Sequence, residues 1–156
     1  EHKFHSDRSG PMDIRWEKGR LALNSANANY SFNQLHTVLQ KALLKVDIQR
    51  LPEGDVLNLG MGAGSSINIL RDELASDNKI ISVEYDPQII QVAEQYFNID
   101  KYDDHVIHEG DENLIEDVFV HAGDSGRTLE VIRLPIVFFN ALDVDMYDDF
   151  TLRIEI

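Results

Sequence analysis

The stretch VLNLGMGAGSS at residues 56–66 runs from an apolar strand into a loop with three glycines and then into the start of a helix. Because glycine lacks a Cβ and tolerates positive φ, such a loop lets the backbone approach a ligand closely. Glu84 ends the next expected strand, twenty residues after Gly64. A carboxylate at that place can accept hydrogen bonds from both hydroxyls of a ribose. The pairing predicts a nucleoside site formed by Gly60, Gly62, Gly64 and Glu84.

Strand and helix patterns alternate along the rest of the chain, which is typical of an α/β protein with a parallel sheet. Asp86 followed by Pro87 marks the start of a helix, since aspartate caps helices and proline fits their first turn. Short apolar runs predict the strands of the sheet at residues 56–59, 80–83, 105–108, 118–120 and 136–139. We therefore expect a Rossmann-like, doubly wound, mostly parallel sheet that binds ligands at the carboxyl ends of its strands.

The N-terminal part of the chain has the pattern of a β-hairpin. Apolar and polar residues alternate over residues 12–24, on both sides of a polar turn at 17–20. A lone hairpin is only marginally stable, so we expect it to pack on a neighbouring element. The expected organisation is a β-hairpin region at residues 1–30 and a Rossmann-like nucleoside-binding domain at residues 31–156.

An amphipathic helix is expected to join the hairpin to the sheet. Apolar residues recur at helical spacing from Leu35 to Val46. Ser31 and Asn33 both stand near the start of this helix, and either side chain can accept a hydrogen bond from a helix amide.

The last third of the chain has connections that are too short for an α/β fold. Asp117 leads directly into an expected strand, and Arg133 passes from an expected helix into a strand with no glycine turn. Connections in α/β units usually need about two to six residues. We therefore expect that the sequence lacks loops near Glu116, Leu134 and Asp145.

The composition is typical of a soluble, acidic, cytoplasmic protein. The 156 residues carry 28 acidic and 14 basic side chains, for a formal net charge of -14. Such a charge repels nucleic acid and attracts cationic ligands. The absence of cysteine excludes disulfides and favours a reducing compartment. No apolar run approaches about 18 residues and no signal-peptide pattern is present, so we expect no membrane as a partner. Because of the negative charge, we also expect no nucleic acid as a partner.

Asp111 follows the third expected strand and completes a row of polar strand ends. Its carboxylate is placed to meet the exocyclic amine of an adenine, and its neighbour Glu112 is included in the predicted cofactor site. Each of these features also has a structural interpretation. The glycines can serve a tight turn, Glu84 can be a solvated strand end, and Asp111 can cap a helix that begins near Leu114.

No metal site is predicted. The histidines have no metal-ligand spacing; they are His36, His105, His108 and His121. A group of aspartates near the C-terminus is typical of a solvated loop; it comprises Asp143, Asp145, Asp148 and Asp149.

The glycine loop, the segment ISVEYDP at 81–87 and the segment EGD at 109–111 resemble the class I S-adenosylmethionine-dependent methyltransferase fold. Within that fold, residues 12–120 resemble the polyamine aminopropyltransferases, the spermidine synthase-like proteins. Residues 23–35 resemble the link between that family's small N-terminal β-domain and its first helix. The resemblance implies a homodimeric transferase whose donor is S-adenosylmethionine or decarboxylated S-adenosylmethionine. It also implies transfer of an aminopropyl or methyl group to a small acceptor, with an amine such as a polyamine expected.

Carried over residue by residue, the resemblance places the family's catalytic aspartate on Asp117. The family's substrate-contacting tyrosine falls on Phe32, its next polar residue on Asn33 and its glutamate on Gln34. The hydroxyl and the carboxylate of the family are therefore absent from two of these positions. Ala63 stands where the family commonly has an acidic residue.

Other functions remain open. Asn140 and Asp143, after the last expected strand, resemble part of the site of metal-assisted catechol-type methyltransferases, which suggests a small-molecule O- or N-methyltransferase. Phe32 and Gln34 suggest instead a nucleoside-binding or dimerisation module without turnover. A dehydrogenase that binds a dinucleotide is disfavoured, because Ser65 stands where that fingerprint has its third glycine.

Overall fold

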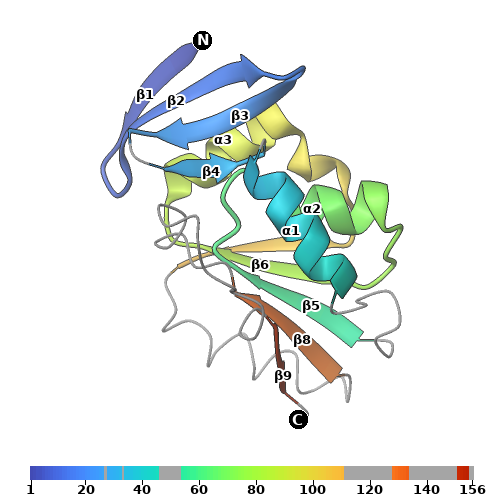
Figure 1. Cartoon of the computed structure of the whole chain (residues 1–156). Helices are drawn as coiled ribbons and strands as arrows, with labels where there is room; N and C mark the ends of the chain where they lie inside the picture. Colours follow the sequence, from blue (N-terminus) through green and yellow to red (C-terminus); the bar gives the residue numbers. More distant parts are fainter. Residues whose placement is uncertain (27, 33, 46–53, 111–127, 134–150, 155–156) are drawn as a thin grey trace.

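The computed structural model describes residues 1–26, 28–32, 34–45, 54–110, 128–133 and 151–154. Within these ranges the chain forms two sheets, and the helices lie between them (Figure 1). The first sheet is N-terminal and antiparallel, and the second is mostly parallel. No helix in this part of the chain is both long enough and apolar enough to cross a bilayer.

The N-terminal sheet has the strand order β1-β2-β3-β4. Its members are β1 (His2–Ser6), β2 (Gly10–Glu17), β3 (Arg20–Ser25) and β4 (Asn29–Ser31). The predicted hairpin is present as β2 and β3, with Glu17 paired to Arg20. Lys18 and Gly19 between them have φ of 50° and 82°, as a two-residue hairpin turn requires. The hairpin is extended on both sides by strands that the sequence pattern does not predict.

The second sheet has the strand order β7-β6-β5-β8-β9. Its members are β5 (Gly54–Leu59), β6 (Ile80–Glu84), β7 (His105–Glu109), β8 (Thr128–Arg133) and β9 (Thr151–Ile154). All pairings are parallel except that of β8 with β9, which confirms a mostly parallel α/β sheet. The chain order reverses between β5 and β8. In sheets of this kind, ligands bind at such a reversal, beyond the carboxyl ends of the strands.

β8 differs from what the sequence pattern predicts. The pattern favours a helix before Arg133, whereas the structure has a strand there. The reason is tertiary, because β8 pairs with β5 on one side and with β9 on the other, and such pairing overrides local preference. The strands predicted at 118–120 and 136–139 lie outside the described residues.

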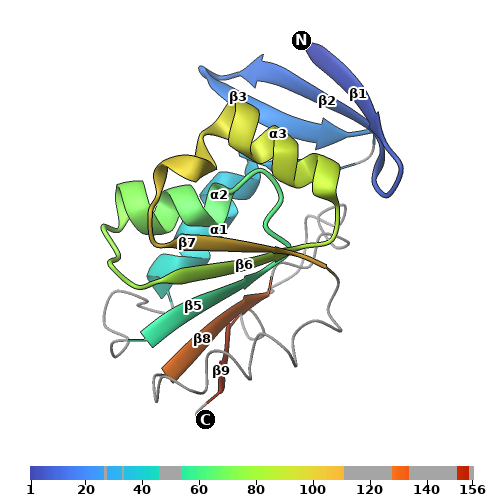
Figure 2. The ribbon, with the colours of Figure 1, turned by 180° about the vertical axis from the view of Figure 1, so that it is seen from behind.

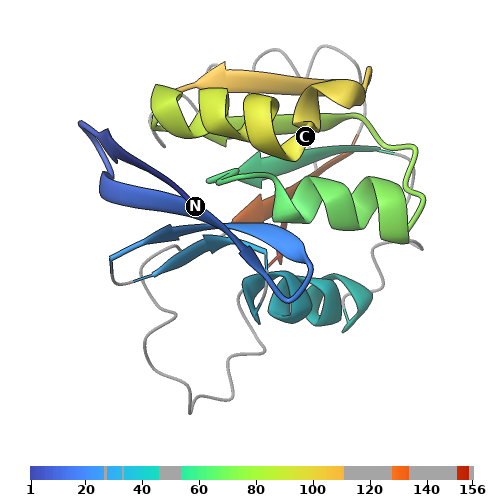
Figure 3. The same cartoon turned by 90° about the horizontal axis from the view of Figure 1, so that it is seen from above.

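The helices within the described ranges lie on one face of the second sheet (Figures 1 and 2). They are α1 (Gln34–Lys45), α2 (Ser65–Asn68) continuing into the π-helix η2 (Ile69–Glu73), α3 (Pro87–Phe97) and the 3₁₀-helix η3 (Ile99–Lys101). Seen from above, α1, α2 and α3 lie side by side (Figure 3). A doubly wound fold also needs helices on the other face, so that part of the expected fold stays a prediction.

The helix starts follow from local signals. Oδ1 of Asp86 accepts a hydrogen bond from Gln88 N at 3.0 Å, so the predicted cap of α3 is confirmed. α1 begins at Gln34, and the candidate cap Asn33 lies outside the described residues. The other candidate cap, Ser31, accepts a hydrogen bond from the glycine loop at 2.6 Å.

One hydrophobic core joins the two sheets. Met12, Ile14 and Leu23 of the N-terminal sheet belong to the same buried cluster as Phe32 and as the residues between the helices and the second sheet. The fully buried members of that second group include Met61, Ile67, Ile69, Leu70, Ile80, Ile89 and Ile99. Because burying one such side chain contributes about 1.5–3 kcal/mol, the shared core holds the N-terminal sheet against the rest of the fold.

Candidate nucleoside-binding site

The loops that follow the parallel strands meet at one edge of the second sheet. The register sets Glu84 of β6 beside Glu109 of β7. Gly60 N donates to Val83 O at 2.9 Å, and Gly110 N donates to the backbone oxygen of Glu84 at 2.9 Å. The structure thus brings the glycine loop and Glu84 together at the carboxyl ends of β5 and β6.

The Glu84 carboxylate is buried, and only 5% of the residue is exposed. Its Oε2 accepts a hydrogen bond from Gly62 N at 2.9 Å, and its Oε1 accepts one from Asp86 N at 3.0 Å. Burial raises the pKa of Glu84, while hydrogen bonds from the amides of Asp86, Gly62 and Tyr85 act in the opposite direction. The Tyr85 amide also bonds to this carboxylate, and a carboxylate has about four acceptor positions in all, so one is left for a further donor. The alternative interpretation of Glu84 as a solvated strand end is therefore wrong.

The glycine loop is shaped by what packs against it. Gly60, Gly62 and Gly64 have φ of 78°, 57° and 88°. A Cβ on Gly62 would lie 2.7 Å from Tyr30 O, and a Cβ on Gly64 would lie 2.5 Å from Ile99 Cγ2. Packing within the chain therefore requires glycine at the second and third positions. A role for these glycines in binding a ligand stays a prediction.

The segment between β4 and α1 lies against this loop. Ser31 Oγ accepts a hydrogen bond from Ala63 N at 2.6 Å, and Phe32 N donates to Ser65 Oγ at 2.7 Å. Phe32 has a φ of 67°, a conformation that costs free energy in a residue with a side chain and persists only where surrounding contacts hold it. The link from the N-terminal sheet is thus fixed directly on the glycine loop.

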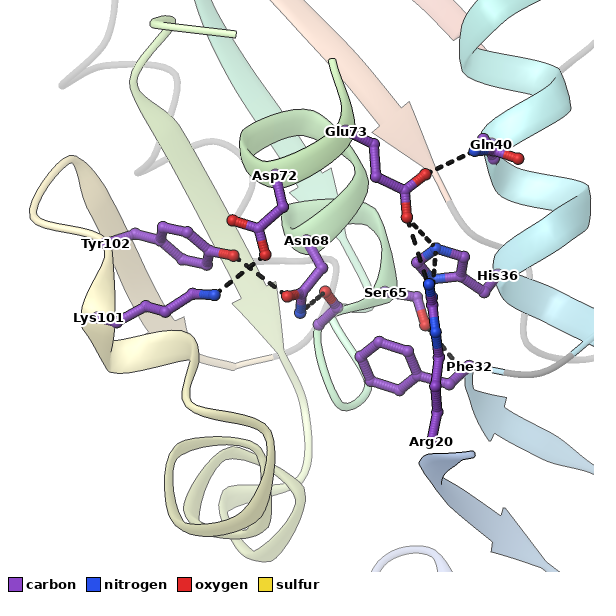
Figure 4. A network of polar contacts seen from close by, with 11 residues as sticks. Arg20, Phe32, His36, Gln40, Ser65, Asn68, Asp72, Glu73, Lys101 and Tyr102 are labelled. Carbon is purple, nitrogen blue, oxygen red and sulfur yellow. Dashed lines mark hydrogen bonds and ion pairs between the residues drawn. The ribbon is translucent and has the colours of Figure 1, made fainter. Parts of the chain in front are cut away.

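The Phe32 ring is part of the core. Its residue is 8% exposed, and its centroid lies 5.1 Å from that of Phe97 and 5.5 Å from that of His36. Figure 4 shows Phe32 beside Ser65, where a polar network of α1 and η2 begins. The resemblance gives this position to a substrate-contacting tyrosine. Phenylalanine lacks the hydroxyl of that tyrosine, so its buried ring cannot form a hydrogen bond with a substrate.

A turn of the N-terminal sheet also reaches this edge. Ser6 Oγ and Ser9 Oγ both donate to Oδ2 of Asp86, which is buried. Burial alone would raise the pKa of Asp86, but the hydrogen bonds from Ser6, Ser9 and two helix amides outweigh it and lower the pKa. Sequence reasoning missed these contacts, because the serines precede Asp86 by 80 and 77 positions and no local pattern connects them.

Several predicted site residues lie outside the described part of the chain; they are Asn33, Asp111, Glu112 and Asp117. Gly110, directly before Asp111, reaches the same edge through its hydrogen bond to Glu84. The roles of these four residues stay predictions. Within the described ranges, no three histidine or acidic side chains gather so that they could hold a metal ion.

Comparison with solved structures shows which fold this is. A probable spermidine synthase from Corynebacterium glutamicum is 13% identical, with 92% of this chain and 54% of that chain covered and a TM-score of 0.62. A spermidine synthase in complex with the transition state analogue AdoDATO is 15% identical, with 83% and 55% covered and a TM-score of 0.53. At these identities the likeness shows the fold alone. The chain has the α/β fold of these structures, in agreement with the resemblance of its motifs.

The chain spans about half the length of both structures. No protein-family model matches the sequence, and no curated protein matches it. The comparisons therefore show the fold of the chain. Its activity, substrate and assembly are proposed below.

Proposed function

We propose that this chain is the donor-binding part of a spermidine synthase-like transferase. It binds S-adenosylmethionine or decarboxylated S-adenosylmethionine and passes an aminopropyl or methyl group to a small acceptor, an amine. The observation that carries the proposal is the buried Glu84 carboxylate, held by the amides of Gly62 and Asp86 at the carboxyl edge of the sheet.

Glu84 is suited to hold the ribose of the donor. The two amides fix the carboxylate before a ligand arrives, so little side-chain freedom is lost on binding. The carboxylate keeps an acceptor position beside its three amide partners, and a ribose hydroxyl supplies a donor for it. Hydrogen bonds to a charged group contribute about 1.5–3 kcal/mol. The carboxylate therefore supports recognition of a ribonucleoside.

The donor already carries the reactive group, so the task of the protein is mainly alignment. The acceptor nitrogen attacks the carbon beside the sulfonium, the C–S bond breaks, and sulfur keeps the electron pair as a neutral thioether. An alkyl amine with a pKa of about 10.4 is protonated at neutral pH, so a base must take its proton. We assign this role to Asp117. The net charge of -14 favours the approach of a cationic acceptor.

Titration calorimetry with both donors tests the proposal. The chain should bind at least one donor, and tighter binding of the decarboxylated form indicates aminopropyl transfer. Glu84→Gln should weaken binding about tenfold or more, because it replaces a charged acceptor. Glu94→Gln is the matched control, since Glu94 is exposed on α3. Absence of donor binding, or unchanged affinity in Glu84→Gln, contradicts the proposal.

A small-molecule O- or N-methyltransferase is the second candidate function. The buried Phe32 ring counts against aminopropyl transfer, because the hydroxyl that the resemblance places there is missing, and this leaves methyl transfer or a module without turnover. Incubation with each donor and with a diamine or a catechol as acceptor separates the two. Methyl transfer without aminopropyl transfer supports the second candidate, and donor binding without any product indicates a module without turnover.

We also propose that the protein is a homodimer, as the resemblance implies. Light scattering on the purified chain measures its mass in solution. A monomer across the concentrations at which the donor binds counts against the dimer.

A further inference from the structure

The turn between β1 and β2 places Arg8 at the carboxyl edge of the second sheet. Ser6 and Ser9, on either side of it, donate their hydroxyls to Asp86. Asp7 N donates to a side-chain oxygen in the first turn of α3 at 3.0 Å. The backbone on both sides of Arg8 is therefore anchored to the start of α3.

The Arg8 guanidinium contacts the ends of β6 and β7. Its Cζ lies 4.3 Å from the centre of the Tyr85 ring, and its Nη1 donates to Tyr85 O. Its Nη2 lies 3.6 Å from Oε1 of Glu109. Tyr85 directly follows Glu84 and is 53% exposed. Arg8 thus covers part of an exposed aromatic ring beside the carboxylate that we assign to the ribose.

The proposed nucleoside site also gives a place for the base. When Glu84 holds the ribose and the glycine loop of β5 faces its 5′ side, the base extends the other way, from β6 toward β7. Neighbouring strands lie about 4.8 Å apart, and Glu84 is paired with Glu109 in the register. The base therefore comes to the residues that Arg8 contacts.

We propose that Arg8 is a specificity-determining residue for the base of the donor. This inference rests on the proposed nucleoside site. A guanidinium is planar, stacks on aromatic rings and donates hydrogen bonds in its plane, so it favours a large purine over a smaller pyrimidine. Lysine keeps the charge but lacks the planar group.

Affinities for adenosine and uridine, which share the ribose, test this in the full chain. Arg8→Ala should weaken adenosine binding about twofold to thirtyfold, the range of a cation–π contact, and weaken uridine binding less. The ratio of the two affinities then falls, and Arg8→Lys should not restore it. Arg15→Ala is the matched control, because Arg15 pairs with Asp13 and Glu17 within the N-terminal sheet. It should leave the ratio unchanged.

The outcomes separate the inference from the function on which it rests. An equal loss for both nucleosides in Arg8→Ala, or no loss, overturns the inference, since a mere clamp between the sheets affects both ligands alike. If thermal melting shows that this variant is unfolded, Arg8→Lys supplies the same comparison. Adenosine binding that is absent from the unmodified chain, or unchanged in Glu84→Gln, overturns the proposed function itself.

Discussion

The backbone N–H of Gly62 donates to the Glu84 carboxylate at 2.9 Å, from the loop after β5 to the end of β6. Both residues are buried. The bond joins the glycine loop to the acidic end of the next strand. Tyr30 packs against Gly62 and Ile99 packs against Gly64. These contacts and the hydrogen bond hold the loop and the carboxylate in one arrangement.

The stability of the fold should carry a pH dependence from Glu84. Burial raises its pKa above the ordinary value of 4.5. A carboxyl with a raised folded-state pKa favours folding while it is protonated, and this contribution is lost as the pH rises through the raised pKa. In urea unfolding, the free energy of the unmodified chain relative to Glu84→Gln should therefore fall from pH 4.5 toward neutrality. A rise over that range would contradict the burial argument, and Glu94→Gln should follow the unmodified chain.

The pH dependence of Asp86 should have the opposite sign. Its pKa is lowered from the ordinary value of 3.8, so its charge stabilises the fold above that pH and the contribution is lost as the pH falls below it. Asp86→Asn should cost about 1–3 kcal/mol near neutral pH, because the side-chain NH2 that replaces Oδ2 cannot accept the hydrogen bonds from Ser6 and Ser9. Urea unfolding at neutral and at acidic pH measures this, and the cost should shrink in acid. Asp77→Asn, at an exposed position, is the control, and an Asp86 cost that does not change with pH contradicts the prediction.

Much of the fold from β5 to β7 is predictable from local sequence signals. Apolar runs mark the strands at 56–59, 80–83 and 105–108, and Asp86 marks the start of α3. The outer strands of the N-terminal sheet are different. β1 contains one large apolar side chain, Phe4, and β4 is three residues long. β1 and β4 are strands because they pair with β2 and β3. Such pairing cannot be recognised from a local sequence pattern.

The candidate site likewise contains residues that the sequence predicts and residues that it does not. Gly62 and Glu84 can be recognised because each directly follows an apolar strand. Ser6, Arg8 and Ser9 cannot, since they reach the same edge through the docking of a separate sheet that precedes it by about half the chain. Sequence spacing therefore finds the residues that the parallel sheet itself positions, and misses those that the N-terminal sheet adds.

Gly64→Ala should be more damaging than Gly19→Ala, although both glycines have a positive φ, 88° and 82°. A Cβ at Gly19 meets nothing within 4 Å, whereas one at Gly64 lies 2.5 Å from Cγ2 of Ile99, which is fully buried. Backbone strain alone costs about 1–2 kcal/mol, and overpacking adds about 1–3 kcal/mol. Urea unfolding of both variants measures the difference. Equal costs would show that the contact with Ile99 relaxes freely.

The polar contacts on either side of η2 should differ in strength (Figure 4). Glu73 accepts from His36 Nε2 at 2.6 Å and from Gln40 Nε2 at 2.6 Å, and His36 is 7% exposed. Asp72 pairs with Lys101 at 3.0 Å, but their side chains are 48% and 46% exposed. Burial strengthens the first pair, and solvent screens the second.

Double-mutant cycles measure both coupling energies by urea unfolding. The cycle of His36→Gln with Glu73→Gln should give about 1–3 kcal/mol, as expected for contacting residues in one hydrogen-bond network. The cycle of Asp72→Asn with Lys101→Gln should give about 0–1 kcal/mol, as expected for an exposed pair, and added salt should reduce it further. A coupling of His36 with Glu73 as small as that of the exposed pair would mean that α1 is held on η2 by apolar packing rather than by this network.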